Sequence, residues 1–259
     1  MPRFAANLSM MFNEVPFLDR FALAAKAGFK GVEFLFPYEH LAAEIAARLK
    51  ENGLQQVLFN APPGDWAKGE RGMAAIPGKQ AAFRDSIKLA LEYATALACP
   101  RLHIMAGLKP EGVAHDTLTA VYGANLAYAA EECAKVGVKP IIEPINHRDI
   151  PGFFLNTTDQ AAAIIAAIGP EKLGLQFDLY HCQITEGDVV KRVEKHLPLI
   201  AHMQVADTPG RNEPGTGEVN WPFVFKTIDA LGFRGWIGCE YRPAGETLAG
   251  LSWFAPYKD

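Results

Sequence analysis

The stretch that decides the fold is "LTAVYGANLAYAAEECAKVG" (118–137) together with "KPIIEPIN" (139–146). The first segment spaces its apolar residues three and four positions apart and ends in glycine, which predicts an amphipathic helix. The second begins as a short apolar run, which predicts a buried strand, and then carries Glu143 and Pro144 where further apolar residues would fit. This part of the chain therefore predicts a helix followed by a strand that ends in a carboxylate.

The same alternation of helix and strand runs along the whole chain. Further helical patterns span 17–28, 41–53 and 81–97, and strand-like segments span 4–10, 31–36, 54–61, 101–107, 139–146, 173–181, 199–207 and 235–241. Alternation without a linker between units predicts parallel strands in one sheet. Eight such units in 259 residues predict an α/β fold, a single (β/α)8 TIM barrel that spans residues 1–259 as one catalytic domain.

A doubly wound open sheet is the structural alternative. That fold more often carries a glycine-rich turn after its first strand, and "NLSMMFNEV" (7–15) contains no glycine. The barrel is therefore the preferred prediction.

Composition narrows the class of protein. The chain is 49% hydrophobic with a net charge of −4, and its basic residues are dispersed, which argues against a nucleic-acid partner. No apolar run reaches membrane-spanning length, and "MPRFAANLSMMF" (1–12) is too short and polar for a signal peptide. Four cysteines without CxxC spacing predict reduced thiols in a cytoplasmic protein. The sequence leaves the oligomeric state open, and a homo-oligomer is compatible with it.

Each of the last four predicted strands carries a polar residue near its carboxyl end. In a barrel the carboxyl ends of the strands face the active site, so these side chains should converge there. They are Glu143, Asp178, Gln204 and Glu240. Each one alone could be a capped or salt-bridged structural residue, but four successive strand ends favour a site. Three carboxylates would repel one another without a cation, and oxygen ligands suit Mg²⁺ or Mn²⁺.

Other residues carry weaker signals. His181 lies three positions after Asp178, beside the proposed metal ligands, whereas His103, His147 and His202 are expected to be hydrogen-bonded structural residues. Arg211 follows the seventh predicted strand and would suit a substrate carboxylate, although a solvated surface arginine explains it equally well.

The long segment 62–78 after the third strand contains Trp66, Glu70 and Arg71. These residues favour a binding loop over a surface loop that has no role in function. No P-loop, HExxH or GxSxG motif is present. We expect no organic cofactor.

Several long motifs resemble the hydroxypyruvate isomerase family, a branch of the xylose-isomerase-like TIM barrels, from about residue 3 to about residue 254. The motifs are "RFAANLSMMFNEVPFLDRF" (3–21), "VEFLFPY" (32–38), "GDWAKGERGMAAIPG" (64–78), "IEPINHRDIPGF" (142–153), "QFDLYHCQ" (176–183), "HMQVADTPGRNEPGTGEVN" (202–220) and "GWIGCEY" (235–241). The resemblance implies isomerisation of hydroxypyruvate to 2-hydroxy-3-oxopropanoate (tartronate semialdehyde). A sister group, the 2-oxo-tetronate isomerases, shares much of the framework, but "GERG" (69–72) and "IEPINHRDIPGF" look closer to the hydroxypyruvate branch.

The resemblance also implies roles for individual residues. Glu143 and Glu240 match the acid/base pair of the family, and Glu143, Asp178, Gln204 and Glu240 match the positions that hold a divalent metal in the superfamily, here expected to be Mg²⁺ with Mn²⁺ as the alternative. Position 204 is often histidine in the related sugar epimerases, so Gln204 departs from them. We expect His181, Arg211 and Arg71 to bind the substrate, a small 2-oxo or hydroxy acid.

Two other functions remain as alternatives. A DNA-repair endonuclease of the same superfamily would need several metal-binding histidines and a basic surface. Few of the seven histidines lie at predicted strand ends and the net charge is −4, which argues against this function. A non-catalytic binding barrel would not need the paired glutamates.

Overall fold

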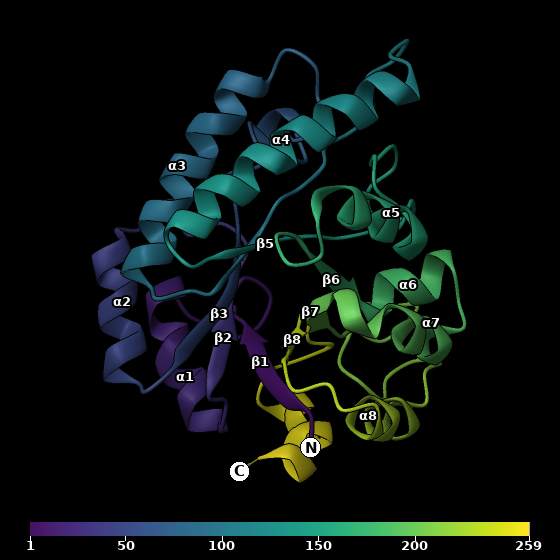
Figure 1. Cartoon of the computed structure of the whole chain (residues 1–259). Helices are drawn as coiled ribbons and strands as arrows, with labels where there is room; N and C mark the ends of the chain where they lie inside the picture. Colours follow the sequence, from purple (N-terminus) through teal and green to yellow (C-terminus); the bar gives the residue numbers. More distant parts are fainter. Residues whose placement is uncertain (259) are drawn as a thin grey trace.

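The computed structural model of the protein describes residues 1–258 and contains a closed barrel of eight parallel strands. The strands follow one another around the barrel in sequence order, with β8 pairing back onto β1 (Figure 1). Their bounds are β1 (Arg3–Asn7), β2 (Gly31–Glu33), β3 (Gln55–Asn60), β4 (Arg101–His103), β5 (Lys139–Ile142), β6 (Gly174–Asp178), β7 (Ile200–Gln204) and β8 (Trp236–Cys239). The predicted TIM barrel is confirmed. Residue 259, the last residue of the predicted domain 1–259, lies outside the described residues.

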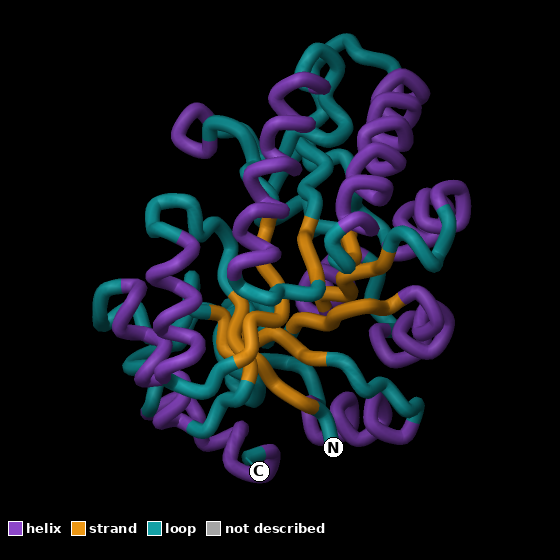
Figure 2. Tube along the Cα trace, turned by 60° about the vertical axis from the view of Figure 1, so that its left-hand side comes forward, coloured by secondary structure: helices purple, strands orange, loops and turns teal. Residues whose placement is uncertain are grey.

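Helices surround the barrel on its outer side (Figure 2). The α-helices are α1 (Arg20–Ala27), α2 (Ala42–Glu51), α3 (Gln80–Ala96), α4 (His115–Lys135), α5 (Thr158–Ile168), α6 (Leu179–Thr185), α7 (Val189–His196) and α8 (Trp221–Ala230). Four short 3-10 helices accompany them within the described residues: η1 (Phe17–Asp19), η2 (Trp66–Lys68), η3 (Leu197–Leu199) and η4 (Ala249–Tyr257). Within residues 1–258, no helix combines the length and the apolar character needed to cross a membrane.

The main hydrophobic core lies between the strands and these helices. On α3 the buried residues Phe83, Ile87 and Ala90 recur every three or four positions, which places them on one face of the helix. On β6 Leu175 and Phe177 are fully buried in this core. Because side chains alternate along a strand, the residues between them face the barrel interior, as the strand parity predicts.

Strand β6 ends earlier than the sequence pattern predicts. The predicted strand 173–181 is correct only to Asp178, because residues 179–181 begin helix α6. The Asp178 carboxylate caps that helix by accepting hydrogen bonds from the backbone N–H groups of Tyr180 (2.7 Å) and His181 (3.2 Å). Aspartate at an N-cap favours helix initiation, so the residue that ends the strand also starts the helix.

Strand β5 likewise stops at Ile142 rather than at the predicted residue 146. Pro144 has no backbone N–H to donate to a neighbouring strand, and the next N–H, from Ile145, bonds to Leu155 O within the loop that follows. Glu143 is therefore the first residue beyond the strand, at the mouth of the barrel.

The N-terminus lies at the opposite end of the barrel from this mouth, at the start of β1 (Figure 1). The segments that follow the carboxyl ends of the strands are thus left to form the site.

Candidate active site

A cavity of about 550 Å³ opens at the carboxyl ends of the strands. Its lining includes five of the seven residues that the sequence predicted for the site: Glu143, Glu240, His181, Arg211 and Arg71. Asp178 does not line the cavity, but its Oδ2 lies 3.7 Å from His181 Nε2. A cavity of this size holds a small organic acid with its hydration water.

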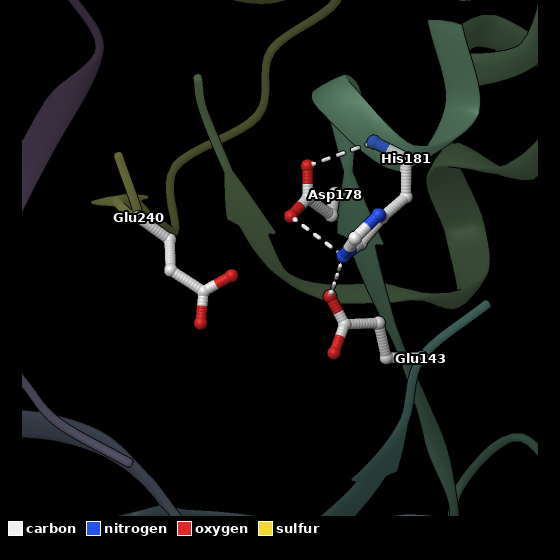
Figure 3. A group of neighbouring side chains, drawn as sticks. All are labelled: Glu143, Asp178, His181 and Glu240. Atoms are coloured by element: carbon white, nitrogen blue, oxygen red, sulfur yellow. Dashed lines mark hydrogen bonds and ion pairs between the residues drawn. The ribbon is translucent and has the colours of Figure 1, made fainter. Parts of the chain in front are cut away.

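Three carboxylates and one imidazole converge on this cavity. Glu143 from the end of β5, Asp178 from β6 and Glu240 from the end of β8 each offer an oxygen within 4.8 Å of the others and of a nitrogen of His181. Figure 3 shows Glu240 on one side of the group, with Asp178, His181 and Glu143 close together on the other side. All four side chains are buried.

Burial makes the ionised forms of these acids costly. Removal from water raises the pKa of Glu143 well above its ordinary value, and the negative charge of Glu240 is the second largest cause. Burial also raises the pKa of Glu240 to about 8 and that of Asp178 to about 6, although Arg211 opposes both shifts. Glutamates with raised pKa values are suited to both taking up and giving back a proton.

Arg211 is the cation that offsets part of this negative charge. Its Nη2 lies 2.5 Å from Glu240 Oε2 and 4.0 Å from Asp178 Oδ2, and its Nη1 lies 3.0 Å from Asp149 Oδ2. Burial alone would lower the pKa of Arg211, but Glu240, Asp178 and Asp149 raise it above its ordinary value. The sequence predicted that Arg211 reaches the mouth; it did not predict that the guanidinium would pair with Glu240.

His181 has a defined tautomer. Asn146 Oδ1 accepts a hydrogen bond from the backbone N–H of Asp149 (2.8 Å), so its Nδ2 is the atom that donates to His181 Nδ1 (2.6 Å). Nε2 of the neutral ring therefore carries the proton and faces Asp178 Oδ2 (3.7 Å) and Glu143 Oε1 (3.8 Å). A protonated nitrogen has no lone pair for a metal, so this geometry supports hydrogen bonding to substrate rather than metal ligation.

Gln204 is held in a buried network below the cavity. Its Oε1 accepts a hydrogen bond from Gln176 Nε2 (2.5 Å), and its Nε2 donates to Glu33 Oε1 (2.8 Å). A carbonyl oxygen has two lone pairs, so Oε1 retains acceptor capacity beside its bond to Gln176. The structure does not include Gln204 among the residues that line the cavity.

Glu33 and His103 are buried polar residues that were not predicted for the site. The prediction that His103 is a hydrogen-bonded structural residue is wrong, because neither of its ring nitrogens has a hydrogen-bond partner. Glu33, at the end of β2, accepts hydrogen bonds from Asn7 Nδ2 (3.0 Å), Gln204 Nε2 (2.8 Å) and His202 Nε2 (2.6 Å). His103, at the end of β4, lines the cavity with Nε2 3.6 Å from Glu143 Oε2. Both end a strand, which is the same signal that identified the acids of the last four strands.

The segment 62–78 forms one wall of the cavity through Arg71 and Trp66. The Arg71 guanidinium stacks 3.8 Å from the Trp66 ring and donates to the backbone carbonyls of Trp66 (3.1 Å) and Glu70 (2.8 Å). Gly72 has φ +117, and a Cβ there would lie 2.4 Å from Met105 O, so only glycine fits this close approach to the segment after β4. The segment thus brings the Arg71 cation to the cavity wall, where these contacts hold it to residues of the same segment.

Comparison with known proteins defines the family. The family model described as xylose isomerase-like TIM barrel matches residues 21–257, nearly the whole chain. The chain belongs to this family. A 2-oxo-tetronate isomerase of Cupriavidus necator is 57% identical over 257 residues, covering 99% of each chain. The hydroxypyruvate isomerase of Escherichia coli K12 is 46% identical and covers 100% of each chain. With relatives of this name and similarity, the protein is an isomerase, and the predicted resemblance is confirmed.

Solved structures agree with the fold. The crystal structure of a Brucella melitensis protein described as AP endonuclease, family 2, matches with a TM-score of 0.98 and 50% identity, covering 100% of each chain. An L-ribulose 3-epimerase structure matches with a TM-score of 0.76 at 21% identity, covering 99% of this chain and 86% of its own, and shows the fold alone.

Proposed function

We propose that the protein interconverts a short 2-oxo acid that has a hydroxyl group on C3 with its 2-hydroxy-3-oxo isomer. Hydroxypyruvate and tartronate semialdehyde are the three-carbon pair, and 2-oxo-tetronate is the four-carbon homologue with a hydroxymethyl group on C3. The observation that carries the proposal is the pair of buried glutamates, Glu143 and Glu240, which face one cavity with raised pKa values. The names of the most similar relatives support the substrate class.

The reaction moves two hydrogens and leaves the composition unchanged. One glutamate, as carboxylate, takes the proton from C3, and the electrons of that C–H bond form the enediolate between C2 and C3. The other glutamate, as carboxylic acid, gives a proton to C2, while the hydroxyl proton moves from O3 to O2. Buried glutamates on two sides of the substrate suit these opposite tasks because each proton-transfer step needs one ionised and one protonated group.

Neighbouring residues orient the substrate. The Nε2–H of His181 points into the acid cluster and donates to a carbonyl or hydroxyl oxygen placed there. Arg211 and Arg71 both line the cavity and bind the substrate carboxylate, which the acids alone would repel. Glu143, His181 and Glu240 are buried, which limits their contact with water and strengthens these interactions.

The residues at the mouth also fit a divalent cation, which we propose to be Mg²⁺ or Mn²⁺. Glu143, Asp178 and Glu240 offer converging oxygens, and Glu143 Oε1 and Asp178 Oδ2 are buried without a hydrogen-bond partner. These three residues, with the amide oxygen of Gln204 from below, would hold it. When bound, such an ion supplies a Lewis acid that stabilises negative charge on the substrate oxygens.

The names of the relatives point to substrates of different carbon-chain length. Identity is higher to the 2-oxo-tetronate isomerase, at 57%, than to the E. coli hydroxypyruvate isomerase, at 46%, whereas the motifs at 69–72 and 142–153 look closer to the hydroxypyruvate branch. The two substrates differ by one hydroxymethyl group, so both belong in the first assay.

The experiment is a turnover assay on both acids with Mg²⁺, with Mn²⁺ and with chelator. The proposal expects isomerisation of at least one acid, together with no cleavage of duplex DNA that contains an abasic site. Cleavage of that DNA without turnover of either acid would instead support the endonuclease alternative.

A further inference from the structure

His103 is a buried histidine whose two ring nitrogens both lack a hydrogen-bond partner. Its side chain is 1% exposed, and among the described residues no other histidine has both nitrogens in this state. The Glu143 carboxyl oxygen Oε2 lies 3.6 Å from Nε2, which is beyond hydrogen-bonding distance. By contrast, Asn146 contacts His181 and Glu33 contacts His202.

A buried polar group without a partner is costly, so native proteins rarely keep one unless a ligand, an ion or ordered water completes it. His103 lines the same cavity as Glu143, His181 and Glu240. It does not belong to the cluster whose oxygen and nitrogen atoms converge within 4.8 Å of one another, which is Glu143, Asp178, His181 and Glu240. The missing partner therefore comes from the contents of the cavity.

The position of His103 relative to Glu143 shows where that partner lies. His103 ends β4 and pairs in register with Ile141 of β5, two residues before Glu143. The Glu143 carboxylate lies between two imidazoles, with His103 Nε2 3.6 Å from Oε2 and His181 Nε2 3.8 Å from Oε1. A substrate carbon that exchanges a proton with Glu143 brings its own oxygens next to both rings.

We infer that His103 is a further substrate-binding residue, which hydrogen-bonds an oxygen of the sugar acid held against Glu143. The inference rests on the proposed function, since it takes the ligand to be the 2-oxo acid. His181 and His103 then bind the substrate from two sides of the same catalytic glutamate. Removal of the His103 contact weakens the enzyme's hold on the substrate without altering the acid/base pair.

Three substitutions test the inference by kinetics. His103→Phe keeps a ring and removes both nitrogens, His103→Asn leaves a polar atom near the position of Nδ1, and His103→Gln leaves one near Nε2. We expect His103→Phe to lower kcat/KM by about 10- to 100-fold, the scale of one lost hydrogen bond to substrate, mainly through KM. One of the two amide variants should recover most of that loss, and His196→Gln, a buried histidine on α7 outside the cavity, should leave both parameters unchanged.

A spectroscopic readout keeps the test independent of how well the variants fold. Imidazole ¹⁵N resonances of His103, assigned by their absence in His103→Gln, are followed while hydroxypyruvate or 2-oxo-tetronate is added to the slow Glu240→Gln enzyme. A shift of the His103 resonances that saturates with the acid supports the contact. Wild-type turnover with unchanged kcat/KM in all three variants, and no shift, would overturn the inference alone and leave water as the partner of His103. Absence of turnover of either acid by the wild type would overturn the proposed function, and the inference with it.

Discussion

The buried glutamate pair predicts that the protein without bound metal loses stability as the pH rises through neutrality. Burial raises the pKa of Glu240 from 4.5 to about 8. Between these two values the folded protein holds a proton on Glu240 and the unfolded chain does not, so folding takes up a proton. A raised carboxyl pKa gives a contribution that is fully present below pH 4.5 and is lost as the pH rises to about 8.

The size of the effect follows from the same shift. At about 1.4 kcal/mol per pKa unit, the whole loss for Glu240 is on the order of 4–5 kcal/mol, and roughly 1 kcal/mol of it falls between pH 7 and pH 8. Glu143, whose pKa is also raised, adds a loss of the same sign. Burial lowers the pKa values of His103, His181 and His202. These histidines therefore make the free energy of unfolding rise with pH, but only up to about pH 6.5, where the unfolded side chains lose their protons.

Urea unfolding at pH 7.0, 7.5 and 8.0 with chelator present measures this slope. We expect the free energy of unfolding of the wild type to fall across the series, and that of Glu240→Gln to fall less by about 1 kcal/mol, whatever its absolute stability. Glu218→Gln, a carboxylate outside the cluster, serves as the control and should retain the wild-type slope. Equal slopes in the wild type and Glu240→Gln would show that Glu240 is already ionised at pH 7, and the electrostatic account of the pair would be wrong.

The remaining predictions concern the substrate and the metal. Arg211→Ala should raise KM more than it lowers kcat, by roughly 1.5–3 kcal/mol in binding, because the carboxylate is held in both ground and transition states; an unchanged KM in steady-state kinetics would remove Arg211 from recognition. Arg71→Ala should also raise KM but by less, because its loop segment makes mainly local contacts. A larger rise in KM than for Arg211→Ala would make Arg71 the main ligand of the substrate carboxylate. Calorimetry should detect one Mg²⁺ or Mn²⁺ per chain and much weaker binding in Asp178→Asn, whereas full activity of protein shown by elemental analysis to lack divalent ions would mean that the carboxylates act alone.

The order and number of the strands were predictable from the sequence because hydrophobic periodicity and glycine punctuation are local signals. The ends of the strands were harder to predict. The apolar pattern of 173–181 continues past Asp178, but the capping hydrogen bonds of that carboxylate turn the chain into α6. A pattern of apolar residues does not distinguish a buried strand from the buried first turn of a helix.

The convergence of Glu143, Asp178 and Glu240 was also predictable, since the carboxyl ends of barrel strands meet at one mouth. The pairing of Arg211 with Glu240 was not, because it depends on the path of the 207–219 loop and on a backbone with φ 56 at Arg211. Glu33 and His103 were missed for a different reason. Only the last four strands had been searched for polar ends, although β2 and β4 carry the same signal.

Solvent-exchange NMR in D₂O tests the central claim most directly, that Glu143 and Glu240 exchange protons with C2 and C3 of a 2-oxo acid. With Mg²⁺ present, the wild type should convert hydroxypyruvate or 2-oxo-tetronate to the 2-hydroxy-3-oxo isomer and deliver at least part of the C2 hydrogen as deuterium. Glu143→Gln and Glu240→Gln should each remain folded and lower kcat by about 10²-fold or more, the usual scale for a positioned acid or base. Near-wild-type turnover in either variant, or no conversion of either acid by the wild type, would contradict the account.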